Sequence, residues 1–260
     1  MIQVAPDWWK TIFDDVYLMT DANIVCNAPL TKREVDTVEQ TLELQAQDRI
    51  LDLCGGQGRH ALELARRSYN RIVVLDYTPF LMHLGRAEAC RAGLPVTFCR
   101  GDARVTPFID ASFDVVLLMA NSFGYFAEAT DDHHMLAEVA RVLVPGGRVL
   151  LDLTDHDYRL QHFVPESWHE ATDDVVVCWR REIVGDVIRV REMVLSKSKG
   201  LLRDRGFAER LYHPDRLSAL LKEMGFVDPV VKTGVFVFDA QDGMDYGIAT
   251  HRMLVTATKG

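Results

Sequence analysis

A glycine-rich turn at residues 52–60, with the sequence DLCGGQGRH, follows a stretch typical of a β-strand and precedes one typical of a helix. Gly55, Gly56 and Gly58 leave the backbone N–H groups at the start of that helix open to a ligand, because glycine has no side chain. The turn therefore predicts a site for a nucleotide-like cofactor. Residues 56–61 also fit the dinucleotide fingerprint with alanine last, so a nicotinamide dinucleotide stays a candidate on this motif alone.

Three aspartates stand at the ends of successive predicted strands. Asp52 precedes the turn, where a carboxylate would repel a pyrophosphate but accept a hydrogen bond from an ammonium group or water. Asp76 closes the next strand and can accept both ribose hydroxyls of either cofactor. Asp102 follows the third strand, between Gly101 and Ala103, where it can accept from an adenine amino group. Together they favour a cationic, adenosine-containing cofactor, although helix caps and solvated strand ends would be a purely structural explanation.

Alternating strand and helix patterns must position these residues. The expected strands are 50–53, 71–76, 96–99, 113–119 and 148–153, and the expected helices are 60–67, 80–91 and one around 136–143. Short connections between alternating strands and helices predict a parallel, doubly wound α/β sheet. The unbroken apolar run at 113–119 predicts a strand buried on both faces, and Pro145 with the glycines that follow is expected to separate the last helix from its strand.

The flanking segments predict a lid and a cap. Residues 7–18 carry apolar side chains at helical spacing, and the capping box from Thr31 to Glu34 predicts the start of a second helix. Antiparallel cap strands are expected at 175–183, 187–195 and 207–211 around a loop at 196–206, and a helix at 214–224 with strands within 227–238 and 251–258 would complete the core. The predicted division is an N-terminal helical lid at 1–46, a core at 47–155 and 212–260, and a cap inserted after the fifth strand at 156–211.

The segment from Leu51 to Gly58 resembles the first motif of the class I S-adenosylmethionine-dependent methyltransferases. The similarity continues through Asp76 and the segments 101–103, 113–116 and 143–147, so that it covers roughly residues 49–153. It implies a Rossmann-like fold, with S-adenosylmethionine as the cofactor and S-adenosylhomocysteine as the product. Cys54 departs from the family's pattern, which has a glycine at this position.

The resemblance assigns each part of the cofactor to its own residues. In chain order, it implies the methionine portion at Gly56 and Gly58, the ribose at Asp76, the adenine at Tyr77, Asp102 and Ala103, and a backbone contact to the amino-acid moiety at Met119. The predicted cofactor site is completed by Asp52, Gly55 and Gly101.

Methyl transfer from a sulfonium is an in-line displacement, so alignment and exclusion of water can supply much of the catalysis. A protonated amine or a hydroxyl acceptor must also lose a proton. The candidate catalytic groups are Tyr17 from the lid, Asn121 after the fourth strand and His156 after the fifth. Tyr17 and the segments 58–60 and 121–126 are similar to small-molecule N-methyltransferases, and an aromatic lid can hold an amine by cation–π contact, so nitrogen is preferred to oxygen as the acceptor.

The amino-acid composition limits the classes of ligand and partner that we expect this protein to bind. A net charge of −9 disfavours nucleic acid, and five scattered cysteines are typical of reduced thiols. No metal is expected, because His156, His162 and His169 share no helix face. No apolar run approaches the roughly 20 residues of a membrane-spanning helix, so we expect a cytoplasmic protein that does not bind membranes. A small molecule is the expected substrate, a homo-oligomer is left open, and an NAD-dependent oxidoreductase and a non-catalytic S-adenosylmethionine-binding module remain as alternatives.

Overall fold

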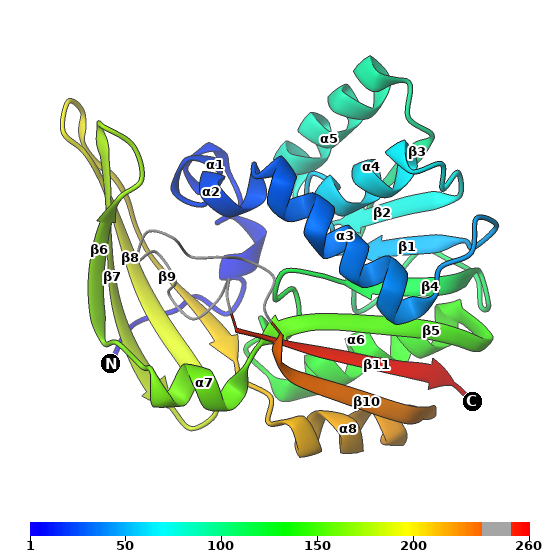
Figure 1. Ribbon diagram of the computed structural model, residues 1–260. Coiled ribbons are helices and arrows are strands. Elements are labelled where there is room, and N and C mark those ends of the chain that lie inside the picture. The colour runs from blue at the N-terminus through cyan, green and yellow to red at the C-terminus, as the bar shows by residue number, and fades with distance from the viewer. Residues whose placement is uncertain (236–250) are drawn as a thin grey trace.

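A seven-stranded sheet forms the centre of the computed structural model, which describes residues 1–235 and 251–260 (Figure 1). Its strand order is β10-β11-β5-β4-β1-β2-β3, and β1 to β5 run parallel to their neighbours within that group. The strands are β1 (Ile50–Leu53), β2 (Ile72–Asp76), β3 (Val96–Arg100), β4 (Phe113–Leu118), β5 (Leu143–Thr154), β10 (Phe226–Val235) and β11 (Arg252–Lys259). Because β11 runs antiparallel to both β5 and β10, the sheet is mostly parallel, as expected.

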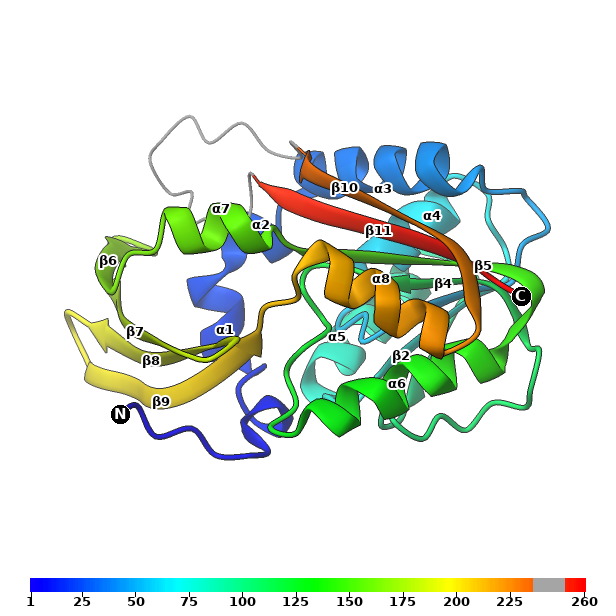
Figure 2. The ribbon, with the colours of Figure 1, turned by 90° about the horizontal axis from the view of Figure 1, so that it is seen from below.

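Helices cover both faces of this sheet, which makes it doubly wound (Figure 2). The helices are α3 (Ala28–Leu42), α4 (Arg59–Arg66) and α5 (Pro79–Ala92) on one face, and α6 (Ala129–Val142) and α8 (Pro214–Glu223) on the other. Along β4, Val115 and Leu117 join the core cluster of the first face, whereas Val116 and Leu118 join that of the second. Successive side chains of a strand point to opposite faces of the sheet. The apolar run is therefore buried on both faces, as the sequence predicts.

A second sheet follows β5, and it is the antiparallel cap that the sequence predicts. After α7 (His156–Gln161) come β6 (Glu166–Glu170), β7 (Val175–Val184), β8 (Val187–Ser196) and β9 (Gly200–Arg210), hydrogen-bonded in that order. The expected loop at 196–206 is wrong, because β9 begins at Gly200 and pairs with β8 along nearly all of its length. Its many charged residues conceal a strand from any hydrophobic pattern, and β6 and α7 escaped prediction for the same reason.

The N-terminal helices also differ from expectation. Residues 7–18 do not form one helix: a 3₁₀ turn η1 (Trp8–Lys10) precedes α1 (Asp15–Thr20) and α2 (Ala22–Val25). The chain restarts at Asp14, whose carboxylate accepts hydrogen bonds from the backbone N–H groups of Val16 (2.9 Å) and Tyr17 (3.2 Å). In Figures 1 and 2, α1 and α2 lie between the cap and the central sheet.

The capping box is a second correction at this end of the chain. Helix α3 begins at Ala28, with Asn27 as its N-cap and Pro29 in its first turn, so Thr31 lies inside the helix. The Asn27 side chain accepts from the Leu30 N–H (3.0 Å), and the Thr31 hydroxyl donates back to the Asn27 carbonyl oxygen (3.0 Å). An asparagine cap followed by proline starts the helix a turn earlier than the threonine signal indicates.

The remaining boundaries lie close to expectation. The main differences are α6, which begins at Ala129 instead of near residue 136, and β5, which begins at Leu143 and includes the Pro-Gly-Gly segment expected to precede it. Of the strand expected within 227–238, residues 236–238 lie outside the described residues. The division into lid, core and cap at the stated residue numbers stays a prediction. Across residues 1–235 and 251–260, no helix is both long enough and apolar enough to cross a membrane.

Candidate functional site

Two adjoining cavities lie where the parallel strands end, beneath the N-terminal helices. The first, which we call the turn cavity, encloses about 1010 Å³ including its opening and is lined by the glycine turn and the ends of β2 to β4. The second, the cap cavity, encloses about 1320 Å³ and is lined by the N-terminal segment, the strand ends and the cap sheet. Five residues line both: Phe13, Tyr17, Val25, Ala120 and Tyr125. The two cavities therefore adjoin, with these residues on their common boundary.

The turn cavity gathers nine of the ten residues predicted to bind the cofactor. The nine are Asp52, Gly55, Gly56, Asp76, Tyr77, Gly101, Asp102, Ala103 and Met119. Gly58 does not line it but begins α4 with a φ of 71°, and a Cβ there would lie 3.0 Å from the ring of Phe98. Gly58 therefore acts by letting the turn bend tightly against β3.

The backbone conformation of Cys54 explains why the family pattern has a glycine at this position. Its φ is 59°, in the left-handed region, next to Gly56, which has the same φ. Left-handed backbone costs a residue other than glycine about 1 kcal/mol or more, which explains why a glycine suits this position in the family pattern. In this chain a cysteine adopts that left-handed conformation.

Asp52 is the buried acid of this cavity. Its side chain has no exposed surface, and neither carboxylate oxygen has a hydrogen-bond partner among the described residues. Gly55 passes so close that a Cβ there would lie 2.7 Å from the carboxyl carbon. Burial raises the pKa of Asp52. An orphaned acceptor facing a cavity suits a ligand with an ammonium or sulfonium group and opposes a pyrophosphate, so the residues present fit S-adenosylmethionine better than NAD.

Asp76 holds the turn from the end of β2. Its Oδ2 accepts from the backbone N–H of Gly56 (2.8 Å), and its Oδ1 accepts from that of Thr78 (2.7 Å). Burial raises its pKa. Each carboxylate oxygen has a second lone pair, so Asp76 can shape the turn and still accept from ribose hydroxyls.

Asp102 lies at the far wall of the turn cavity. Arg104 donates to it from the backbone N–H (3.0 Å) and from the guanidinium (2.7 Å). Burial opposes ionisation of Asp102, but the Arg104 hydrogen bonds lower its pKa overall. Trp9 packs edge-on to Tyr77 with ring centres 5.1 Å apart, and the Arg104 guanidinium lies 4.7 Å from the ring centre of Phe126. The Trp9 and Tyr77 rings are nearly perpendicular, so with Phe126 they form an aromatic part of the lining of the turn cavity.

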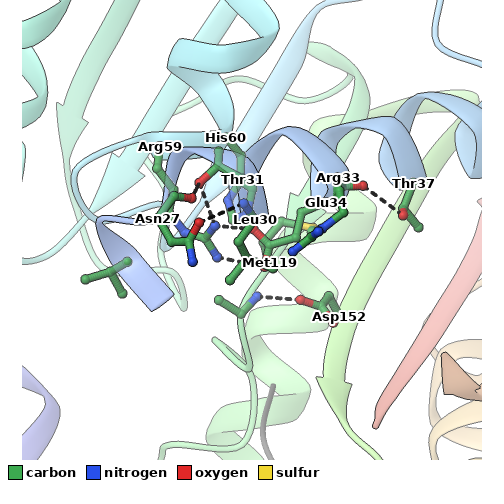
Figure 3. Close-up of polar contacts among 12 residues, drawn as sticks. Asn27, Leu30, Thr31, Arg33, Glu34, Thr37, Arg59, His60, Met119 and Asp152 are labelled. Atoms are coloured by element: carbon green, nitrogen blue, oxygen red, sulfur yellow. Dashed lines mark hydrogen bonds and ion pairs between the residues drawn. The ribbon is translucent and has the colours of Figure 1, made fainter. Parts of the chain in front are cut away.

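A buried ionic group near α3 and α4 was not singled out from the sequence (Figure 3). Arg59 lines the turn cavity and forms an ion pair with Glu34, which also accepts from His60 Nε2 at 3.0 Å. Burial would raise the pKa of Glu34, yet the neighbouring His60 and Arg59 lower it to about 2. An arginine so held presents a fixed cation to the cavity, suited to a carboxylate. The arginine directly after Gly58 is the sequence feature that could have indicated this ionic group. From the sequence alone, Glu34 was interpreted only as part of a helix cap.

Tyr17 lies at the junction of the two cavities. Burial raises the pKa of its phenol well above the ordinary value, and the nearby charge of Asp21 adds to this. Its ring packs edge-on to Phe13 with centres 5.0 Å apart. At neutral pH the phenol stays protonated, so it can donate a hydrogen bond but does not serve as a strong base.

Asn121 lines the cap cavity and joins the core to the cap. Its amide nitrogen donates to Glu209 Oε2 (2.6 Å), and its amide oxygen accepts from the backbone N–H of Thr154 (2.9 Å). Both Ala120 and Asn121 have left-handed backbone, with φ of 53° and 63°. Such strain persists only where surrounding contacts hold it, and it often marks functional sites.

His156 does not join Tyr17 and Asn121 in lining the cavities. It begins α7, its Nδ1 pairs with Asp157 at 2.7 Å, and its ring packs against His213. It is not among the residues that line either cavity. The described part of the chain also holds no group of three or more His, Cys, Asp or Glu residues arranged to bind a metal ion.

Known proteins resemble this chain most clearly in the core. A family model described as a methyltransferase domain matches residues 50–147. A demethylmenaquinone methyltransferase from Deinococcus radiodurans is 42% identical over 104 residues, which is 40% of this chain and 42% of the relative. The ubiquinone/menaquinone biosynthesis C-methyltransferase UbiE of Teredinibacter turnerae is 33% identical over 178 residues, 64% of this chain and 69% of the relative. The chain spans about half the length of several of the curated relatives it matches.

Similarity of structure extends further than similarity of sequence. The S-adenosylmethionine-bound CalS10, an amino pentose methyltransferase from Micromonospora echinaspora, superposes with a TM-score of 0.66 at 17% identity. The superposition covers 95% of this chain and 97% of that one. The strand order, the motif residues around the turn cavity and the sequence relatives agree, and the chain belongs to the class I S-adenosylmethionine-dependent methyltransferase family.

Proposed function

We propose that this chain transfers the methyl group of S-adenosylmethionine to a small-molecule acceptor bound in the cap cavity, leaving S-adenosylhomocysteine. The observation that carries the proposal is that the turn cavity, with the family's cofactor motif, adjoins a second cavity with which it shares five lining residues. Two ligands must meet along one line for a displacement at the methyl carbon. Adjoining cavities with a common wall supply that arrangement.

The cofactor would lie across the ends of β1 to β3. Asp52 would accept from the ammonium group directly or through water, Asp76 from the ribose, and Asp102 would lie beside the adenine, near Trp9 and Tyr77. Arg59 is positioned for the methionine carboxylate. The cofactor supplies an electrophilic methyl group on a sulfonium, and these residues bind it, orient it and keep water away.

Tyr17 and Asn121 are the residues we propose at the reacting end. Tyr17 keeps its proton, so its oxygen can accept a hydrogen bond from the acceptor's N–H or O–H group and leave the attacking lone pair free. The proton that the acceptor loses would pass to water. Asn121 has both ends of its amide engaged, so it positions the strained end of β4 between the two cavities. We give His156 no part in the transfer, because it lines neither cavity.

The charged lining of the cap cavity supports a polar acceptor, with nitrogen preferred to oxygen. Its carboxylates are Asp21, Glu34, Asp152, Glu192 and Glu209, and its guanidiniums are Arg159, Arg181, Arg203 and Arg252. Aromatic side chains line the same space and can contact a cationic amine. Carbon of a quinone is the second candidate acceptor, because relatives at 42% and 33% identity are quinone methyltransferases by name.

Calorimetric titration with S-adenosylmethionine, S-adenosylhomocysteine and NAD tests the cofactor first. Binding of the first two without NAD supports the proposal, whereas binding of NAD alone supports an oxidoreductase. Release of S-adenosylhomocysteine is then measured with amines, alcohols and a demethylated quinone. Binding without release across all acceptors would favour the non-catalytic module. Cytoplasmic location, a possible homo-oligomer and the exclusion of nucleic acid and membrane partners stay predictions.

A further inference from the structure

The carboxylates of the cap cavity differ in what neutralises them. Asp152 pairs with Arg252 at 2.7 Å, and Glu192 pairs with Arg203 at 3.0 Å. Glu209 lies 3.8 Å from Arg159 and also accepts from Asn121, while Glu34 pairs with Arg59 and His60. Four of the five carboxylates therefore have a cationic partner from the protein itself.

Asp21 is the exception. In the described part of the chain it makes no ion pair, and its one side-chain partner is the neighbouring Thr20 hydroxyl, which donates to Oδ2 at 2.7 Å. The side chain is half-buried and lines the cap cavity. A carboxylate that is partly desolvated and lacks a cation from the protein attracts one from a ligand.

Asp21 also lies close to the junction of the cavities. It ends α1, where its backbone N–H donates to the Tyr17 carbonyl oxygen at 3.0 Å. Residues four apart on a helix share a face, so Asp21 and Tyr17 point into the same space. Tyr17 in turn belongs to an aromatic wall in which Phe13 packs against Tyr17 and against Tyr125, with centres 5.0 and 6.2 Å apart. An anion beside aromatic faces is a recurrent way to hold a protonated amine.

We propose that Asp21, beside the aromatic wall of Phe13, Tyr17 and Tyr125, is the anionic subsite that binds a protonated amine of the methyl acceptor. The acceptor class is therefore a small polar molecule that carries a cationic amine, rather than a neutral alcohol or a quinone. This inference rests on the proposed function, because it assigns the cap cavity to the acceptor.

The charges around Asp21 are consistent with an ionised carboxylate under mildly basic conditions. The pKa of Asp21 is raised to about 6, chiefly by burial and also by Glu192 of β8, against the opposing effects of the Thr20 hydroxyl and Arg203 of β9. The Tyr17 phenol beside it stays neutral. An amine cation would offset the burial and return the pKa of Asp21 toward its ordinary value.

Matched amine and alcohol pairs test the subsite directly. The probes are 2-phenylethylamine against 2-phenylethanol and cyclohexylmethylamine against cyclohexylmethanol, titrated by calorimetry at about pH 8, where such amines stay protonated. Each titration is run with and without S-adenosylhomocysteine. The variants are Asp21→Asn, which keeps the shape and the Thr20 contact, and Asp15→Asn, an exposed aspartate of the same helix, as the control.

The wild-type protein should bind each amine about tenfold or more tightly than its alcohol, as expected for a hydrogen bond between charged groups. Asp21→Asn should abolish this preference and leave the alcohol and S-adenosylhomocysteine affinities within about twofold, and Asp15→Asn should change neither. Equal binding of amines and alcohols by the wild-type protein, absence of amine binding, or a preference that survives Asp21→Asn overturns the proposal. Failure to bind S-adenosylhomocysteine would instead contradict the proposed function, and the titration without it still decides on Asp21.

Discussion

The turn cavity and the cap cavity share five residues but are assembled in different ways. The acids of the turn cavity come from strands adjacent in the sheet: Asp52 lies near the end of β1, Asp76 ends β2 and Asp102 comes just after β3. The cap cavity depends on contacts between distant segments. Arg203 of β9 pairs with Glu192 of the cap, donates to the Ile12 carbonyl oxygen at 3.0 Å and also pairs with Asp14.

The specificity for the cofactor and the specificity for the acceptor should therefore depend on different kinds of structure. The turn cavity, where the cofactor would bind, depends on backbone conformation. It is built from glycines with left-handed φ and one acid at each strand end, and an apolar sheet supports it. The acceptor end is an arrangement of paired charges between three segments. Changes to the sheet should therefore damage both ends, whereas changes to the charged contacts should damage the acceptor end alone.

The largest effect should come from the sheet that both cavities need. Leu117 of β4 is fully buried, so Leu117→Ala should lower the free energy of unfolding by about 4 kcal/mol through lost burial and a cavity. Leu201→Ala on the cap, where the side chain is 60% exposed, should cost less than about 0.5 kcal/mol. Urea unfolding measures both, and equal losses would contradict the division into a supporting core and a peripheral cap.

A smaller loss should follow from the charged contacts of the cap. Arg203→Met leaves Glu192 buried without its cation, which should cost about 3 kcal/mol. Adding Glu192→Met should recover part of this loss, because the unpaired charge is then gone. Limited proteolysis should find the N-terminal segment freed, while S-adenosylhomocysteine affinity falls less than amine affinity. If cofactor binding were lost to the same extent as amine binding, the two ends would not be separable.

A substitution of Asp76 should affect the turn cavity, where the cofactor would bind. Asp76→Ala removes the acceptor of the Gly56 and Thr78 N–H groups and of the expected ribose contacts, so calorimetry should show S-adenosylhomocysteine binding weakened by about 1 to 3 kcal/mol. Asp110→Ala, an exposed aspartate outside both cavities, is the matched control. Unchanged affinity in Asp76→Ala would remove this residue from the site.

Tyr17 should give the smallest effect, and one confined to turnover. Tyr17→Phe keeps the aromatic wall but removes the hydroxyl. The activation free energy of turnover should therefore rise by about 1 kcal/mol, which lowers kcat, while the affinity for S-adenosylhomocysteine stays unchanged. Tyr158→Phe, outside both cavities, should alter neither quantity. Turnover that is unaffected by Tyr17→Phe would leave alignment of the two ligands as the whole contribution of the lid.

Prediction from sequence succeeded where structure is local. The five parallel strands and the helices between them follow from alternation and apolar runs, and Asp52, Asp76 and Asp102 were placed together because parallel strands end at one edge. It failed at the lid, where the Asp14 and Asn27 caps outweighed an apolar spacing and a threonine signal. It failed again at β9, whose charged residues read as a loop until their partners on the N-terminal segment are seen.

The amino-acid sequence by itself therefore determined the sheet, the glycine turn and the kind of cofactor, because each depends on backbone conformation and on residues near one another in the chain. The cap cavity, our proposed acceptor site, became apparent only in the tertiary structure. That structure showed that Arg59 lines the turn cavity and that His156 lines neither cavity. It also showed that, among the residues the structure describes, Asp21 makes no ion pair, whereas the other four carboxylates of the cap cavity do. Contacts such as Arg203 with Asp14 or Asn121 with Glu209 join residues far apart in sequence, and side chains that meet only on folding leave no periodic pattern along the chain.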